Sequence, residues 1–356
     1  MDKVLETALQ LRHQLHNCAE LSGHEVVTRA TLIAFLKEHP SLEIHDCGPG
    51  LFAVHREAEC TKPSIALRAD YDALPTPGGG AAHLCGHDGH SAGLCAVGML
   101  LEGKTLNRNV FLLFQPAEET GEGALQCLDL FSREKVDLVF GLHNMPGLPA
   151  GKVYTRYGSA ACASLGLIIR YSGRPAHAAY PETGISPAAA VGELLCRIAE
   201  LNQPGRYEGL AMATVIGCRM GEKAFGKSAS EAEIWLTLRG GYKNDFDDLT
   251  EEVRRHAREL AETYRLSYEE EMQDVFPSTE NHDDAVKMIL EACHGEIKEE
   301  PMRASEDFGH FLQRCPGAFL WVGAGEDHPQ LHAGDYEYPD EILAASVQAY
   351  WDLLTF

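Results

Sequence analysis

The stretch HLCGHDGHSA, residues 83–92, concentrates side chains that can bind metal ions. Cys85 and His87 are separated by one residue, so a tight turn would let a thiolate and an imidazole reach one ion. Single cysteines and histidines are usually structural. The pair is therefore a weak indication until further ligands are found elsewhere in the chain.

Three other motifs contain such ligands. QPAEETGEG places Glu118 and Glu119 directly after the apolar run VFLLF, GLHNMPG contains His143, and HPQLHAGD contains His328 and His332. Adjacent acidic residues are common on protein surfaces. A strand this apolar is nevertheless expected to be buried and to end in a crevice rather than in bulk water.

A set of five ligands exceeds what one structural zinc ion needs and suits two ions that share a water molecule; the set is Cys85, His87, Glu119, His143 and His332. Thiolate, imidazole and carboxylate groups favour Zn²⁺, and Mn²⁺, Co²⁺ or Ni²⁺ could bind them too. Glu118 then remains as a base. The pattern predicts attack by a metal-activated water.

Two other interpretations compete with this one. Cys85 could be a nucleophile, because a cysteine close to histidine and aspartate can act as one. A thiolate that binds a metal is committed to it, however, and the Glu118–Glu119 pair would have no task. The protein could also be a non-catalytic metal-binding scaffold. Glu118, which binds no metal in our scheme, favours catalysis.

The ligands lie far apart in the sequence, so the fold must bring them together. Short apolar runs begin at residues 51, 64, 109 and 136, and segments 91–102 and 123–132 have helical patterns between them. Alternating strands and helices predict an α/β layer with a largely parallel, buried sheet. Asp70, Glu118 and His143 follow such strands, and ligands bind at the carboxyl ends of strands in sheets of this kind.

The pattern changes near residue 161 to strand, helix, two strands and helix, which indicates a small α+β insert with an antiparallel sheet. The α/β pattern resumes near Pro277. We therefore expect a catalytic domain formed by residues 1–160 and 275–356, interrupted by an inserted domain at 161–274.

Composition limits the partners and the location. The chain has 356 residues and a formal charge of −23, which should repel nucleic acid and anionic lipid. Its apolar runs are too short to cross a bilayer, and its first residues do not resemble a signal peptide. Eleven irregularly spaced cysteines do not resemble a disulfide framework. These features predict a cytoplasmic protein.

Seven ordered motifs resemble a family of metal-dependent amidohydrolases: ALRADYDALP, CGHDGH, FQPAEE, GLH, GRPAHAAYPETGISP, SEDF and LHAGDYEYPDE. The family contains hippurate hydrolase, the plant indole-acetyl-amino-acid hydrolases and N-acetyldiaminopimelate deacetylase, and it is related to aminoacylases and glutamate carboxypeptidases. The resemblance covers essentially the whole chain. It implies an α/β, zinc-exopeptidase-like catalytic domain and an inserted ferredoxin-like lid that also forms a homodimer.

The resemblance also assigns roles. It implies a dinuclear site held by the five ligands, with Glu118 as general base and acid. Asp72 and Asp88 would orient imidazoles, and His177 on the lid would polarise the scissile carbonyl, in its own or the partner subunit's site. The implied reaction is hydrolysis of the amide bond of N-acyl amino acids, with dipeptidase or carboxypeptidase activity as the alternative.

Some residues depart from the family pattern. Gly226, Lys227 and Ser228 stand where the lid motif usually reads Asn-Val-Ile-Pro, PETGISP lacks the usual His and Asp, and the segment Thr76–Gly80 is shortened. The metal ligands are untouched, but substrate choice is put in doubt. Arg239 occupies the place of a family arginine and is expected to bind a substrate carboxylate. Lys227 is expected to alter selectivity.

Overall fold

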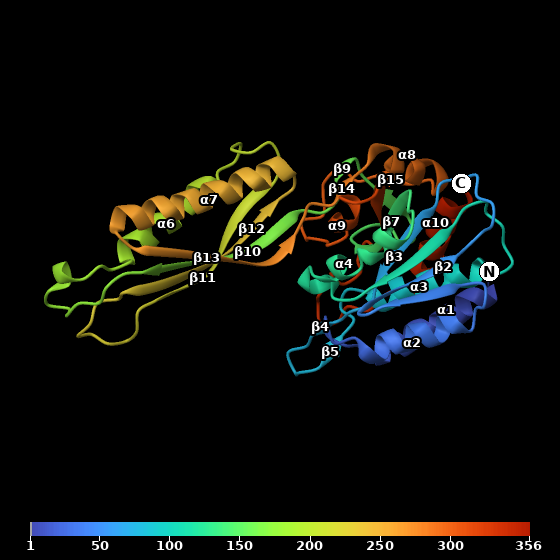
Figure 1. Cartoon of the computed structure of the whole chain (residues 1–356), viewed down its shortest axis with the longest axis horizontal. Helices are drawn as coiled ribbons and strands as arrows, with labels where there is room; N and C mark the ends of the chain where they lie inside the picture. The colour runs from blue at the N-terminus through green and yellow to red at the C-terminus, as the bar shows by residue number, and fades with distance from the viewer. Residues whose placement is uncertain (1) are drawn as a thin grey trace. The chain divides into compact units, whose positions relative to one another are not determined.

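The computed structural model describes residues 2–356 and divides the chain into two compact units (Figure 1). The first unit contains the residues up to Ala160, Thr279–Pro301 and Asp307–Phe356. The second contains Ala161–Ser278 and Met302–Glu306. Within residues 2–356, no helix is both long and apolar enough to cross a membrane.

An eight-stranded sheet forms the centre of the first unit, in the order β1-β2-β6-β3-β7-β16-β8-β15. Its neighbours β6, β3, β7 and β16 pair in parallel, whereas β1, β2 and β8 introduce antiparallel pairs. This confirms the predicted mixed, largely parallel sheet. The strands are β1 (Glu43–Cys47), β2 (Gly50–His55), β3 (Ile65–Asp70), β6 (Val110–Gln115), β7 (Leu138–Pro146), β8 (Val153–Thr155), β15 (Glu296–Ile297) and β16 (Gly317–Gly325).

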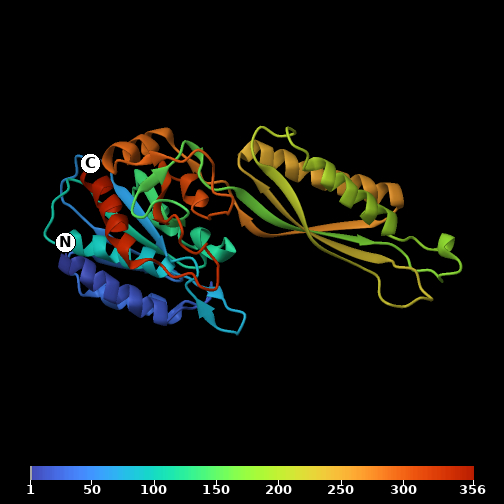
Figure 2. The same ribbon diagram turned by 180° about the vertical axis from the view of Figure 1, so that it is seen from behind.

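Helices cover the sheet. Every residue of β2, β3 and β6 is buried, as expected for strands covered on both faces. One face packs against the long helices, and Figure 2 shows red α10, cyan α3 and blue α1 together on that side. These helices are α1 (Asp2–Asn17), α2 (Val26–Lys37), α3 (His87–Leu100), α8 (Asp283–Ala292) and α10 (Leu343–Thr355).

Shorter elements complete the first unit. Two small antiparallel pairs accompany the main sheet, β4 (Leu74–Pro75) with β5 (Ala81–Ala82) and β9 (Gly158–Ser159) with β14 (Glu280–Asn281). The predicted helix at 123–132 is instead two short helices, because Cys127 and Leu128 interrupt it. The short helices are η1 (Glu118–Thr120), α4 (Gly123–Gln126), α5 (Asp129–Arg133), α9 (Gly309–Leu312) and η3 (Asp340–Ile342).

The second unit has the β-α-β-β-α-β order of the ferredoxin-like arrangement. Its four antiparallel strands lie in the order β11-β12-β10-β13. Buried and less buried residues alternate along β10 and β12, so one sheet face packs against the helices. The elements are β10 (Ala163–Ser172), η2 (Pro181–Thr183), α6 (Ala188–Leu201), β11 (Ala211–Met220), β12 (Glu231–Gly240), α7 (Lys243–Tyr264) and β13 (Ser267–Phe276).

Candidate active site

A glycine turn places the first ligands. The sequence pattern predicted a helix from Ser91, but α3 begins at His87, directly after Gly86 in the left-handed conformation with φ 92°. A Cβ at Gly86 would lie 2.4 Å from Asn144 Oδ1, so a larger residue would displace the Asn144 side chain. The turn leaves Cys85 before the helix and His87 on its first turn.

A second tight turn follows β6. Ala117 is left-handed, with φ 50°, and the chain then enters the short turn Glu118–Thr120. Gly123 closes the turn, and a Cβ there would lie 1.7 Å from the Pro116 carbonyl oxygen. Glu118 is 6% exposed as a result. The acidic pair is therefore not an ordinary solvent-exposed one.

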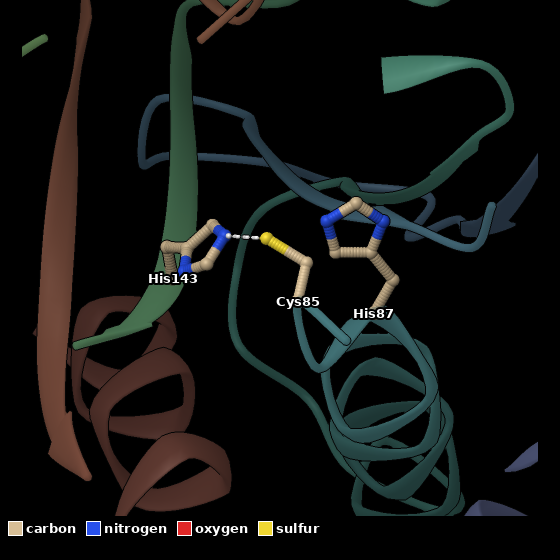
Figure 3. A group of neighbouring side chains, drawn as sticks. All are labelled: Cys85, His87 and His143. Carbon is tan, nitrogen blue, oxygen red and sulfur yellow. Dashed lines mark hydrogen bonds between the residues drawn. The ribbon is translucent and has the colours of Figure 1, made fainter. Parts of the chain in front are cut away.

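Cys85 lies at the centre of the cluster. Its Sγ atom is 3.5 Å from the Nε2 atoms of both His143 and His332, the latter 247 residues away in the sequence. Figure 3 shows the Cys85 side chain between His143, on β7, and His87, at the start of α3. Glu119 Oε1 is 3.5 Å from His332 Nε2 and 3.8 Å from His87 Nε2. The five predicted ligands thus converge within the first unit.

The cluster has the chemistry of a cation site. Among the described residues, five groups of three side chains have ligand atoms within 4.8 Å of one another. Two of them include Cys85: one adds His87 and His143, the other Glu119 and His332. His87 Nε2 and Glu119 Oε1 are buried without a hydrogen-bond partner. Buried polar atoms normally have partners. A divalent cation would satisfy both atoms, so the residues fit a metal.

Asp72 orients His87. Its Oδ1 atom lies 2.9 Å from His87 Nδ1, which leaves Nε2 directed at the cluster. Its Oδ2 atom accepts hydrogen bonds from Ser22 Oγ at 2.7 Å and from the Glu119 amide at 3.0 Å. One carboxylate thus holds an imidazole and the backbone of the acidic pair.

Asp88 points elsewhere, although we expected it to orient an imidazole of the site. Its carboxylate lies 2.8 Å from His16 Nδ1 and 3.3 Å from Arg12 Nη1, both on α1. Successive residues of an α-helix project about 100° apart, so His87 and Asp88 face different neighbours. In this structure Asp88 binds α1 rather than a predicted ligand.

A buried polar network that sequence reasoning did not assign lies beneath the ligands. Arg68 donates to Asp70 Oδ2 at 2.6 Å, to Gln115 Oε1 at 2.8 Å and to Asp307 Oδ1 at 3.1 Å. Asp70 Oδ1 lies 2.6 Å from His90 Nδ1. An arginine within the apolar strand sequence SIALRAD was the available signal, because a buried guanidinium needs carboxylate partners.

The same network extends to β7. His90 Nε2 lies 2.6 Å from Asn144 Oδ1, and Asn144 donates from Nδ2 to Tyr336 Oη at 2.5 Å. The Asn144 carbonyl oxygen lies 2.7 Å from His143 Nδ1. This bond directs His143 Nε2 towards Cys85. His90 therefore contacts Asn144, the residue whose carbonyl oxygen orients the candidate ligand His143.

The electrostatics favour a cation. Burial lowers the pKa of His87, but Asp70 and Asp72 outweigh this and raise it to about 10. Burial and the Glu119 and Glu118 carboxylates raise the pKa of the Cys85 thiol well above its usual range. The carboxylate contributions to both shifts reflect buried negative charge around the two side chains. A bound dication would compensate it.

Three predicted residues lie in the second unit. His177 is exposed and forms an antiparallel bridge with Lys227, whose Nζ donates to Glu222 at 3.2 Å. Arg239, on β12, donates to the Arg303 carbonyl oxygen at 3.1 Å and to Ser305 Oγ at 2.9 Å. Arg239 thus anchors the segment Met302–Glu306 within this unit.

Comparison with known proteins defines the class. Residues 66–355 match peptidase family M20/M25/M40, so the chain belongs to this family, and it is an amidohydrolase. It is 30% identical to hippurate hydrolase of Campylobacter jejuni, covering 96% of this chain and 94% of that protein. It is 28% identical to N-acetylcysteine deacetylase of Bacillus subtilis, covering 99% and 97%.

A solved structure agrees with this assignment. The chain is similar to a Bacillus subtilis peptidase of the M20 family that is described as dinuclear and metal binding, with a TM-score of 0.84 and 26% identity. The match covers 100% of this chain and 98% of that one. The similarity therefore includes both units.

Proposed function

We propose that the protein hydrolyses the amide bond of N-acyl amino acids with two divalent cations and with Glu118 as general base and acid. The observation that carries the proposal is the convergence of two ligand groups on Cys85, with Glu118 buried beside them. The substrates in the names of the two curated relatives support the substrate class.

The two groups suggest how the cations would be held. The residues that would hold the ions come from the two groups that include Cys85, namely Cys85, His87 and His143, and Cys85, Glu119 and His332. Zn²⁺ or Mn²⁺ suits this set best, and Co²⁺ or Ni²⁺ could replace them. When bound, such ions polarise a carbonyl group and lower the pKa of a water molecule.

Glu118 would move the protons. Its Oε2 atom lies 4.0 Å from His87 Nε2, which places the carboxylate beside the proposed ligands. It takes a proton from the attacking water and returns it to the leaving nitrogen. The water oxygen joins the acyl carbon as the C–N bond breaks. The products are a carboxylate and a free amino acid.

The second unit would act as a lid and as a dimer contact. His177 would polarise the carbonyl group of the scissile amide, and Arg239 would bind the carboxylate of the substrate. Lys227 would alter the selectivity among substrates. Ile216 and Met220, on edge strand β11, are 60% and 42% exposed, and an apolar edge strand is suited to pairing with another chain. Homodimerisation through this unit and a cytoplasmic location stay predictions.

A substrate panel tests the proposal. Purified protein with a measured content of Zn²⁺ or Mn²⁺ is incubated with N-acetyl, N-benzoyl and longer N-acyl amino acids, and released amine is quantified. Matched dipeptides form the second arm. We expect cleavage of N-acyl amino acids. Preference for dipeptides would favour the peptidase alternative, and inactivity of fully metallated protein on both sets would favour a scaffold.

A further inference from the structure

Glu25 occupies a helix-capping position but does not cap the helix. It directly precedes α2, where a side-chain oxygen often accepts a hydrogen bond from the first turn. No such bond is made by Glu25. Glu20 makes it instead, with Oε2 accepting from the Thr28 amide at 2.8 Å and from Thr28 Oγ1 at 3.0 Å. The Glu25 carboxylate is therefore available for another contact.

That contact reaches the candidate active site. Glu25 Oε1 accepts a hydrogen bond from the Ala117 amide at 2.8 Å, across 92 residues of sequence. Glu25 is only 7% exposed, and burial raises the pKa of its carboxyl group. Burying a carboxylate is costly unless hydrogen bonds compensate it. The bond to Ala117 is such a compensation.

Ala117 is a residue that needs to be held. It has φ 50° and ψ 39°, a left-handed conformation that a Cβ atom disfavours. Its carbonyl oxygen accepts from the Gly123 amide at 3.1 Å and from Thr120 Oγ1 at 3.2 Å. Glu25 holds the opposite side of the residue, the N–H. Together these bonds set the direction in which the chain enters Glu118.

The backbone after Glu118 is held from the same segment of chain. The Glu119 amide donates to Asp72 Oδ2, and Ser22 Oγ donates to that same oxygen. The amides immediately before and after Glu118 are thus each bound by a buried carboxylate. Ser22 and Glu25 are three residues apart. Ser22 bonds to the Asp72 carboxylate that holds the Glu119 amide, and Glu25 holds the Ala117 amide directly.

We propose that Glu25 is a positioning residue, which fixes the left-handed turn at Ala117 so that the Glu118 carboxylate faces the metal ligands. The inference rests on the proposed role of Glu118 and deepens it. Glu25 itself touches neither substrate nor metal in this proposal. Its effect is transmitted through one backbone amide.

Two substitutions at Glu25 separate this role from general support of the fold. Glu25→Ala removes the acceptor, whereas Glu25→Gln retains an amide oxygen for the Ala117 N–H. For Glu25→Ala we expect faster hydrogen exchange in peptides that cover 115–121. We also expect kcat to fall about ten- to hundredfold, with KM and metal content little changed, since misplacement of a reacting group acts on turnover. Glu25→Gln should restore both exchange and kcat.

A matched control and a rescue sharpen the test. Glu20→Ala removes the carboxylate that caps α2, so it should lower Tm while leaving exchange at 115–121 and kcat near those of the wild type. Glycine adopts positive φ without strain. Adding Ala117→Gly to Glu25→Ala should therefore recover part of the lost kcat.

Several results would overturn the inference. The first is an unchanged hydrogen exchange rate at 115–121 in Glu25→Ala. The second is an equal loss of kcat in Glu25→Gln and Glu25→Ala. The third is that Glu25→Ala loses metal while its kcat is retained. Failure of the proposed function gives a different result, namely no amine release from N-acyl amino acids by the wild type. In that case the exchange comparison still decides whether Glu25 holds the turn.

Discussion

The Sγ atom of Cys85 lies 3.5 Å from Nε2 of His143, and both side chains are buried. The contact joins the turn before α3 to strand β7, so it depends on the packing of the helix on the sheet. Burial and neighbouring carboxylates raise the pKa of the thiol. A thiolate at this position therefore requires a cation, which couples the state of Cys85 to metal binding.

Cys85→Ser should weaken metal binding, because a hydroxyl is a much poorer ligand than a thiolate for soft divalent ions. Activity should fall and recover partly with excess Zn²⁺ or Mn²⁺. Metal content and activity are measured across a metal titration, with Cys95→Ala as a control for a buried α3 cysteine outside the ligand set. A fully metallated Cys85→Ser protein that is inactive at every metal concentration would instead favour the nucleophile mechanism.

Glu118→Gln should lower kcat by about 10²- to 10⁴-fold, the usual contribution of a proton-transfer group. Metal content should stay unchanged, because we assign no ion to this side chain. Glu122→Gln, an exposed substitution just beyond the same turn, provides the control. Loss of metal from Glu118→Gln would make Glu118 a ligand and would contradict the assignment.

Asp72→Asn and Asp88→Asn should have different consequences, although both carboxylates are buried. Asp72 contacts His87, so its substitution should weaken metal affinity about 10- to 100-fold. Asp88 contacts Arg12 and His16, so its substitution should destabilise the protein by about 3 kcal/mol or more while sparing metal affinity. Chelator competition and denaturant unfolding measure the two quantities. Equal loss of metal affinity in both variants would refute the distinction.

Arg239→Ala should raise KM for N-acyl amino acids much more than for the corresponding carboxamides, because a guanidinium pairs specifically with a carboxylate. Arg239 also bonds to Arg303 and Ser305, so the variant could simply loosen that segment. The paired substrates separate the two effects. An equal rise in KM for acid and carboxamide substrates would indicate that Arg239 only supports the fold. Lys227→Ala should change the order in which the N-acyl derivatives of different amino acids are preferred as substrates.

His177→Ala should slow turnover and leave both metals bound, because the residue belongs to the second unit and would act on developing charge. Mixed dimers of His177→Ala and Glu118→Gln subunits should regain activity if His177 serves the partner subunit's site. Absence of any gain in verified mixed dimers would assign His177 to its own subunit.

Much of the fold and of the candidate ligand set was predictable from local patterns. Largely apolar runs identified β3, β6 and β7, because most side chains of a strand covered on both faces are buried. Polar residues at the ends of those runs identified Glu118, Glu119 and His143, because parallel strands direct their carboxyl ends to the same edge. The spacing of Cys85 and His87 was only a weak indication of a metal site by itself, and the other candidate ligands strengthened it.

The supporting contacts depend on packing between distant segments. Asp72 and Asp88 both looked suited to orient an imidazole, yet the rotation of α3 turns Asp88 towards α1 and leaves Asp72 with His87. Glu25 directly precedes α2 and was not singled out from the sequence, and it binds Ala117 across 92 residues. Side-chain direction and long-range hydrogen bonds follow from how helices and strands pack, and no pattern within a few residues encodes that geometry.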